Sequence, residues 1–474
     1  MKRLYKPSEY KTLQHKTELR HMISHLRIEQ VKMMKDLHPL MCSFVKTILY
    51  YIQFDSKELI NFAIWLKCYL EKLTREHIAA SHAKYMTTLE KFHVAKQKNS
   101  NEVEGLKKDV DNNESDLLSA SLGFEHFIRE IAQVYEAILD HESRVSGETI
   151  NNATWFPKVP ANLLMAGFPF ELMNGDLIHV PIVWVKAVLN ELAALIGDKK
   201  CLIVSVVGIQ SSGKSTLLNM MFGLQFPVGH GRITKGAFMQ LIPVNDERLS
   251  FEIIVVIDTE GLRAPELGHE NYQHDNEFAT FIMGIADINI VNINGESQGE
   301  MNEVLQMVVH ALLKMKTASD SLNLKQSCIF VHQNVKTDDG NNDALEYSLQ
   351  RMINLLDEMT TEAADQLDIS DIESFKQVID FDKRHVWYLP NLYTGEHPIT
   401  RVNPSYSRGI EKIKETILFE IATQRQAYFT LTDTNSRIED IWNGILTEDF
   451  AFNFKNNLEA KAFTKLDSHY QELY

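Results

Sequence analysis

Apolar side chains recur at three- and four-residue steps through the N-terminal part of the chain, from about residue 18 to residue 96. This spacing is typical of α-helices that turn one apolar face toward a core. Asp55, followed three residues later by Glu58, is a typical helix start within this region. The face that follows is formed by Leu59, Phe62, Leu66, Tyr69 and Leu73. We therefore expect residues 1–96 to form an N-terminal helical region that serves packing rather than chemistry.

A polar stretch then interrupts the helical period. Residues 97–116 are rich in Asn, Ser, Asp, Glu and Lys and hold few large apolar side chains. This composition predicts a polar, mobile linker. The helical period returns over residues 117–150, where Phe124, Phe127 and Ile131 share one face. We expect a second helical segment there.

From residue 151 onward, short apolar runs alternate with helical segments. The runs cover residues 202–207, 251–257, 285–293, 327–332 and 385–390. Such alternation is typical of an α/β domain in which helices connect mainly parallel strands. We predict this domain over residues 151–425 and the start of a C-terminal helical region over residues 426–474. Because the last helical pattern runs close to the chain end, the sequence is compatible with a piece of a longer protein.

Length, charge and cysteine usage exclude several classes of function. The 474 residues fit two or three domains. A net charge of -16, from 64 acidic and 48 basic residues, opposes nonspecific binding to nucleic acid. The four cysteines lie far apart, which argues against a structural zinc site or a disulfide framework. The sequence holds no transmembrane segment and no signal peptide, so we expect a cytoplasmic protein, with the nucleus as the alternative.

One loop carries a chemical signature. Residues 208–215 read Gly-Ile-Gln-Ser-Ser-Gly-Lys-Ser, the G-x-x-x-x-G-K-S pattern, between an apolar run and a helical segment. Glycines let backbone N–H groups meet phosphate oxygens, Lys214 adds a positive charge, and the Ser215 hydroxyl is a ligand for Mg²⁺. A chance Gly/Ser turn rarely has a buried strand before it and a helix after it. The residues assigned to the nucleotide are Gly208, Ser212, Gly213, Lys214, Ser215 and Thr216.

Two further segments complete a predicted phosphate and metal site. Asp258-Thr259-Glu260-Gly261 follows directly after an apolar run, and we predict that Asp258 holds Mg²⁺ through water. The Gly261 N–H is placed to bond the γ-phosphate, so the loop after it switches with hydrolysis. Thr234 lies in a polar loop before the next strand, where its hydroxyl completes the metal shell and positions the attacking water. The predicted metal ligands are therefore Ser215, Thr234 and Asp258.

The residues after the apolar run at 327–332 are candidates for recognising the base of the nucleotide. A GTPase normally places there an Asp that accepts the guanine N1 and N2 protons, but this position holds Asn334. An amide has one acceptor oxygen where a carboxylate has two and a charge, so we expect weaker guanine selectivity. Gln333 and Asp338 are the alternatives for reading the base. An ATP-driven transporter ATPase is a further alternative, against which stands the absence of an L-S-G-G-Q-like signature.

Taken together, these motifs resemble the GTPase domain of the interferon-inducible very large GTPases. That family belongs to the dynamin-like superfamily, beside guanylate-binding proteins and atlastins. The resemblance covers about residues 150–450 and is carried by residues 163–176, 208–215, 234–241 and 258–262. The E-L-M-x-G-D leader and the T-x-G-A-x-M-Q-L segment are specific, whereas the phosphate loop alone is not.

The resemblance implies a P-loop GTPase domain with a mainly parallel sheet, flanked by N- and C-terminal helical regions. It implies binding of GTP with Mg²⁺, slow intrinsic hydrolysis, and pairing of G domains that accelerates hydrolysis. The proteins it points to are large, induced by interferon and tied to innate defence. The resemblance implies that Gln210 positions the attacking water and that Ser211 contacts the region of the oxygen bridging the β- and γ-phosphates. Lys214 and Thr234 complete the implied catalytic set.

Two departures from related GTPases leave a rival interpretation open. Leu262 stands where many small GTPases carry a water-orienting Gln, and Ser211 stands where guanylate-binding proteins carry an arginine finger. Together with Asn334, these residues favour the alternative of a nucleotide-binding scaffold with negligible hydrolysis.

Overall fold

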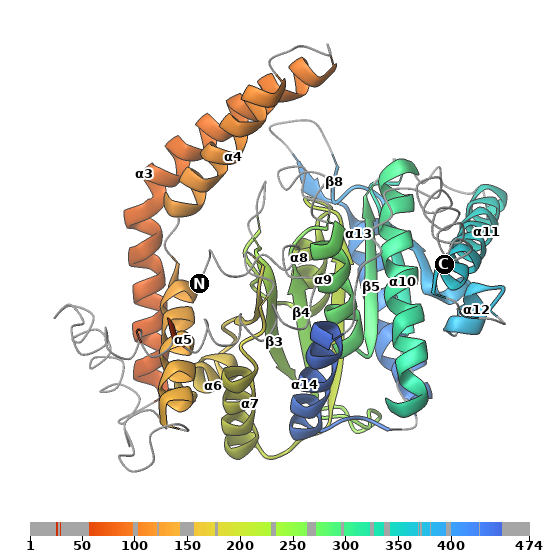
Figure 1. Ribbon diagram of the computed structural model, residues 1–474. Coiled ribbons are helices and arrows are strands. Elements are labelled where there is room, and N and C mark those ends of the chain that lie inside the picture. The colour runs from red at the N-terminus through yellow and green to blue at the C-terminus, as the bar shows by residue number, and fades with distance from the viewer. Residues whose placement is uncertain are drawn as a thin grey trace, which may run out of the picture. The chain divides into compact units, whose positions relative to one another are not determined.

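The structure is a computed structural model in which the chain divides into two compact units, Met1–Ala166 with Pro265–Gly268 and Gly167–Ala264 with His269–Tyr474 (Figure 1). It describes residues 25–26, 29, 56–97, 103–120, 123–142, 156–175, 179–228, 234–262, 272–294, 298–322, 327–335, 342–367, 369, 372–379, 381–394, 400–425 and 427–447. Within these ranges, no helix combines the length and the apolar character that crossing a membrane requires.

The first unit is helical in its described parts. Its helices are α3 (Ser56–Gln97), α4 (Val103–Ala120), α5 (Phe124–Glu142) and α6 (Lys158–Met165). The buried face of α3 includes Ala63, Leu66 and Leu70, whereas the predicted face residues Tyr69 and Leu73 are exposed. Apolar residues cover a broad part of this helix. The face that packs is therefore turned about the helix axis relative to the predicted face.

The predicted polar linker is wrong for most of its length, because residues 103–120 form α4, which packs along α3. Val110 is buried, and the Asn113 amide donates a hydrogen bond to the Thr88 hydroxyl of α3 at 2.9 Å. Its few apolar residues recur at helical steps, and packing against α3 outweighs the polar composition. In α5 the predicted face is borne out, with Phe124 and Ile131 buried.

The second unit is built on a seven-stranded sheet with the strand order β1-β3-β4-β2-β5-β6-β7. The strands are β1 (Phe170–Asn174), β2 (Cys201–Gly208), β3 (Gly236–Pro243), β4 (Ile253–Thr259), β5 (Ile288–Asn294), β6 (Ser327–Gln333) and β7 (Val386–Tyr388). Neighbouring strands from β4 through β2, β5 and β6 to β7 are parallel, and β3 runs antiparallel to both β1 and β4. The expected α/β fold with a mainly parallel sheet is thereby confirmed.

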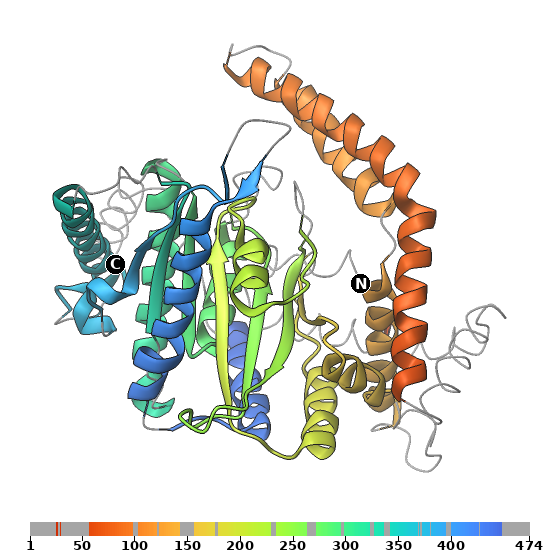
Figure 2. The same cartoon turned by 180° about the vertical axis from the view of Figure 1, so that it is seen from behind.

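Helices cover both faces of this sheet. They are α7 (Ile182–Ile196), α8 (Lys214–Phe222), α9 (Tyr272–Ile285), α10 (Gln298–Leu322), α11 (Asn342–Gln366), α12 (Phe375–Val378), α13 (Pro404–Glu415) and α14 (Leu431–Thr447). Figure 1 shows α9, α10 and α14 in front of the sheet, and Figure 2 shows α8 and α13 on the opposite face. On that opposite face Val204 and Val206 of β2 share a core with Leu217 of α8 and Ile413 of α13. A short hairpin of β8 (Tyr393–Thr394) and β9 (Arg401–Val402) precedes α13.

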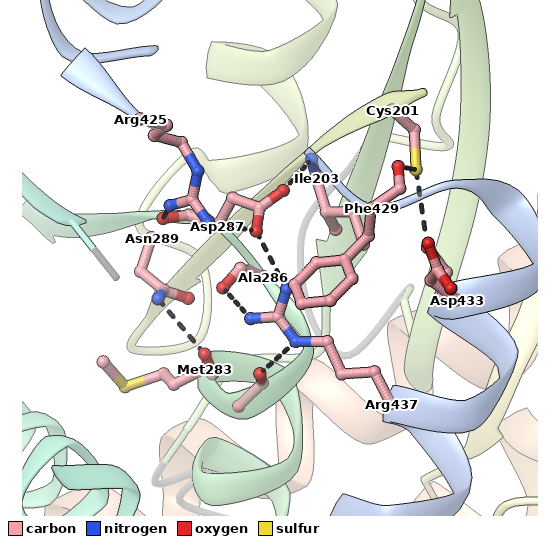
Figure 3. A network of polar contacts seen from close by, with 12 residues as sticks. Cys201, Ile203, Met283, Ala286, Asp287, Asn289, Arg425, Phe429, Asp433 and Arg437 are labelled. Carbon is pink, nitrogen blue, oxygen red and sulfur yellow. Dashed lines mark hydrogen bonds and ion pairs between the residues drawn. The ribbon is translucent and has the colours of Figure 1, made fainter. Parts of the chain in front are cut away.

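A buried carboxylate ties the segment after α13 to the amino end of the sheet. Asp287 lies just before β5 and is 1% exposed. One of its oxygens accepts hydrogen bonds from Arg425 and Arg437, each at 2.8 Å, and the other accepts from the Ile203 N–H at 2.9 Å (Figure 3). We call Asp287, Arg425 and Arg437 the arginine clasp. Both arginines offset the cost of burying the carboxylate.

The clasp also involves the helix that follows the predicted border at residue 426. Arg437 of α14 donates to the carbonyl oxygens of Gly284 and Ala286 at the end of α9, at 3.0 and 2.9 Å. Helix α14 packs on α7 and α9 within the second unit. At the other end, the units divide after Ala166 rather than at residue 151. The functional extent of the GTPase domain stays a prediction.

Candidate nucleotide site

The phosphate loop connects the central strand of the sheet to a helix. β2 is buried along its whole length and ends at Gly208, and α8 begins at Lys214. Two residues of the loop have left-handed backbone conformations, Ser211 with φ 58° and Gly213 with φ 84°. Such a tight loop directs successive N–H groups toward one concave surface, which favours an anion, and the helix N-terminus adds to this effect.

Lys214 lies inside this loop. It is 6% exposed, and its ammonium group donates to the Ile209 carbonyl oxygen at 2.8 Å. Burial lowers the pKa of Lys214 to about 8, although the nearby carboxylates of Asp258 and Glu260 act in the opposite direction. A buried ammonium group gains from a strong anionic partner, and a phosphate supplies one.

The three predicted metal ligands converge. The Ser215 hydroxyl donates to Oδ2 of Asp258 at 2.8 Å, and the Thr234 hydroxyl donates to the same oxygen at 3.2 Å. Asp258 is fully buried, and burial raises its pKa to about 6, against the lowering effect of the Ser215 hydrogen bond. Its Oδ1 has no hydrogen-bond partner among the described residues. A buried carboxylate with a free oxygen beside two hydroxyls fits the oxygen ligands that Mg²⁺ prefers. Their role as metal ligands stays a prediction.

The turn after Asp258 is bonded directly to the phosphate loop. The Leu262 N–H donates to the Gly208 carbonyl at 2.9 Å, and the Gln210 N–H donates to the Leu262 carbonyl at 3.3 Å. A side chain at Gly261 would overlap the backbone of Gln210, so only glycine fits this close approach. Leu262 itself is buried. Gln210 is half-buried and Ser211 exposed, and the structure thus places Gln210 beside Gly261.

Glu260 is a residue of the site that the sequence reasoning missed. It is 2% exposed, and its Oε2 accepts the Gly236 N–H at 2.8 Å. Gly236 begins β3, two residues after Thr234. Glu260 therefore links the turn of Asp258 to the loop of Thr234. The signal in the sequence that could have indicated this role was a glutamate within the Asp258-Thr259-Glu260-Gly261 motif, directly after an apolar run.

The structure separates the candidates for reading the base. Gln333 is buried, and its amide group is held by Asn292 and the Tyr406 hydroxyl. This placement argues against Gln333 as a base reader. Asn334 is exposed with φ 57°, and its Nδ2 donates to Oδ1 of Asn294 at 2.6 Å. Asp338 lies outside the described residues. Asn334 thus remains the candidate, and its role stays a prediction.

A mainly parallel sheet with this loop at the carboxyl end of its central strand defines a P-loop nucleotide-binding protein. The family model for the URGCP-like GTPase domain matches residues 1–407. The chain belongs to that family.

Known proteins agree with this assignment. Interferon-induced very large GTPase 1 of Homo sapiens is 37% identical over 465 residues, which cover 96% of this chain and 19% of that protein. The up-regulator of cell proliferation of Bos taurus is 33% identical over 316 residues, which cover 63% of this chain and 32% of that protein. The expected relationship to the very large GTPases is confirmed, and the chain spans about a fifth of that relative's length (19%).

Among solved structures, a dimerization-deficient mutant of Toc33 from Arabidopsis thaliana aligns with 51% of this chain and 93% of that chain. The sequences are 14% identical and the TM-score is 0.30.

Proposed function

We propose that this chain binds GTP at the phosphate loop and hydrolyses it to GDP and phosphate. The proposal rests mainly on the convergence of Ser215 and Thr234 on the buried carboxylate of Asp258, next to the loop that holds Lys214. Membership of a GTPase family supports guanosine triphosphate as the substrate. Asn334 in place of an Asp favours a weaker preference for guanine than other GTPases show.

Binding is assigned to the loop and to the start of α8. The N–H groups between Gly208 and Lys214 bond the phosphate oxygens, and the Lys214 ammonium group exchanges the Ile209 carbonyl for the β- and γ-phosphates. Ser215 and Thr234 would hold Mg²⁺ directly and Asp258 through water. Mg²⁺, when bound, neutralises charge on the β- and γ-phosphate oxygens.

The attack of water on the γ-phosphate is assigned to residues of the same loop. Leu262 has no polar group and is buried, so it cannot orient a water molecule. Gln210 is placed beside Gly261, whose N–H is assigned to the γ-phosphate. We therefore assign to Gln210 the orientation of the attacking water, and to Ser211 a contact with the β/γ bridge.

Replacing Gln210 by Ala tests this assignment. We expect GTP and GDP to bind with unchanged affinity and single-turnover hydrolysis to slow by about a hundredfold, because the side chain acts on the water and not on the nucleotide. Equilibrium binding and rapid-quench assays measure the two quantities separately. The exposed Gln225 offers a matched control, since Gln225→Ala removes the same group away from the loop. An equal loss of binding and hydrolysis in Gln210→Ala would contradict the assignment.

The remaining parts of the proposal concern self-association, cellular location and biological role. We propose that the G domain pairs with a second copy in a nucleotide-dependent way and that pairing accelerates hydrolysis. We also propose that the protein is cytoplasmic, with the nucleus as the alternative, and that it acts in innate defence. Induction by interferon is part of this proposal, which the name of its relative, interferon-induced very large GTPase 1, supports. The alternative is a nucleotide-gated scaffold with negligible turnover, which the apolar Leu262 favours.

A further inference from the structure

A chain of buried hydrogen bonds runs from helix α13 to the phosphate loop. The Tyr406 hydroxyl donates to Oε1 of Gln333 at 3.2 Å, and Nε2 of Gln333 donates to Oδ1 of Asn292 at 2.6 Å. Nδ2 of Asn292 then donates to the Ser212 carbonyl oxygen at 2.7 Å and to the Ser212 hydroxyl at 3.0 Å. All four residues are at most 5% exposed. The chain crosses β6 and β5 and ends in the middle of the loop.

The direction of this chain is fixed at the loop end. The Ser212 carbonyl can only accept, so Asn292 must turn its NH₂ group toward the loop and its oxygen toward Gln333. The same requirement turns the NH₂ group of Gln333 toward Asn292 and its oxygen toward Tyr406, which donates its hydroxyl proton. Every amide group is thus satisfied in one arrangement only. A reversed amide would place two acceptors or two donors face to face inside the protein.

Two residues of this hydrogen-bond chain, Asn292 and Gln333, also lie close to the two glycines of the loop, Gly208 and Gly213. A side chain at Gly208 would overlap the carbonyl oxygen of Asn292. At Gly213, an added Cβ would lie 3.4 Å from Oε1 of Gln333. Asn292 and Gln333 therefore lie close to the loop at its first and its last glycine.

We propose that Asn292 and Gln333 are positioning residues that aim the loop at the phosphates. In a trans peptide the carbonyl and the following N–H point in opposite directions. Because Asn292 holds the Ser212 carbonyl inward, the Gly213 N–H is directed to the opposite side, where the phosphates are assigned. This inference rests on the proposed function and deepens it. It also gives Gln333 a role in phosphate binding instead of base reading.

The test compares buried amides on the same strand. Asn292→Leu keeps the branched shape of the side chain but loses both hydrogen bonds to Ser212. Asn289→Leu is the matched control, since Asn289 is equally buried in β5 and bonds Ser205 and Met283, away from the loop. Dissociation constants for fluorescent GDP and a GTP analogue are measured by titration, with melting curves in parallel. We expect Asn292→Leu to weaken both nucleotides at least about tenfold and Asn289→Leu to leave affinity unchanged at a similar loss of stability.

A split between binding and rate separates positioning from a purely structural role. The Gly213 N–H is assigned to the phosphates before and during the reaction, so the single-turnover rate at saturating GTP should change much less than the dissociation constant. Loss of folded protein would lower the binding amplitude instead and leave the dissociation constant unchanged. Equal affinities for wild type, Asn292→Leu and Asn289→Leu would overturn the inference.

Gln333→Met provides a second variant should Asn292→Leu not fold. It keeps the shape of the side chain and removes its bonds to Asn292 and Tyr406, so we expect a smaller loss of affinity, about threefold or more. Unchanged nucleotide affinity in Gln333→Met would contradict the inference that the hydrogen bonds from Tyr406 to Ser212 act together. Wild-type protein that binds neither nucleotide would refute the proposed function itself, which makes the two failures distinguishable.

Discussion

Lys214→Ala is expected to lower the affinity for GTP and GDP by about a hundredfold or more. The substitution removes a buried ammonium group that is assigned to the β- and γ-phosphates, and losing a desolvated charge partner typically costs about 3 kcal/mol. The lysine makes this contact from inside the protein, where it is 6% exposed. Titration with a fluorescent GDP derivative measures the loss.

The same substitution should not destabilise the protein without nucleotide. Burial lowers the pKa of Lys214 to about 8, which means that the folded protein disfavours the charged lysine relative to the unfolded chain. That penalty is present below pH 8 and fades as the pH rises above it, so removing the group should leave the melting temperature at pH 7 equal or higher. Lys199, whose side chain is 40% exposed and pairs loosely with Glu252 at 3.9 Å, gives the control Lys199→Ala. Wild-type affinity in Lys214→Ala would contradict the account of the loop.

Arg437→Ala is expected to reduce the free energy of unfolding of the second unit by about 3–5 kcal/mol, because it removes one partner of a buried ion pair. Arg437 is buried and bonds the Asp287 carboxylate together with the carbonyl oxygens of Gly284 and Ala286 (Figure 3). After its removal, two carbonyls at the end of α9 lose a donor, and Asp287 keeps Arg425 as its charged partner among the residues that the structure describes. Helix α14 would then lose its polar contacts to Asp287 and to the end of α9.

Urea unfolding measures this effect. Because the chain has two compact units, the relevant transition is the one that saturating nucleotide shifts to higher urea. Arg408→Ala is the control, since Arg408 lies exposed on α13 with a single 3.3 Å bond to Ser405, and we expect it to change stability by less than about 0.5 kcal/mol. An Arg437→Ala protein that unfolds at the wild-type urea concentration would show that the clasp is not a main attachment.

The sequence predicted those parts of the site whose chemistry depends on a fixed local pattern. Gly208, Gly213, Lys214 and Ser215 lie in one loop, so their spacing alone places them together. Asp258 was predictable because it ends an apolar run, and parallel strands bring their carboxyl ends to one edge.

Other features depend on contacts between distant segments. Gln333 and Asn334 are neighbours in the sequence, yet β6 ends at Gln333 and Asn334 has a φ of 57°. The Gln333 side chain is therefore buried against Asn292, whereas the Asn334 side chain is exposed. The clasp joins Asp287 to Arg437 over 150 positions, a pairing that no local pattern reveals. The helix α4 was mistaken for a linker because its composition is polar, whereas its stability comes from packing on α3.

The central claim is that this chain hydrolyses GTP and that pairing of its G domain accelerates the reaction. The most direct test measures GTP hydrolysis per molecule over about two decades of protein concentration, with sedimentation of nucleotide-free, GDP-bound and GTP-analogue-bound samples in parallel. The account predicts a rate that rises with concentration together with dimers that form only with the analogue. Tight nucleotide binding with flat, background turnover across the whole range would contradict it and favour the scaffold.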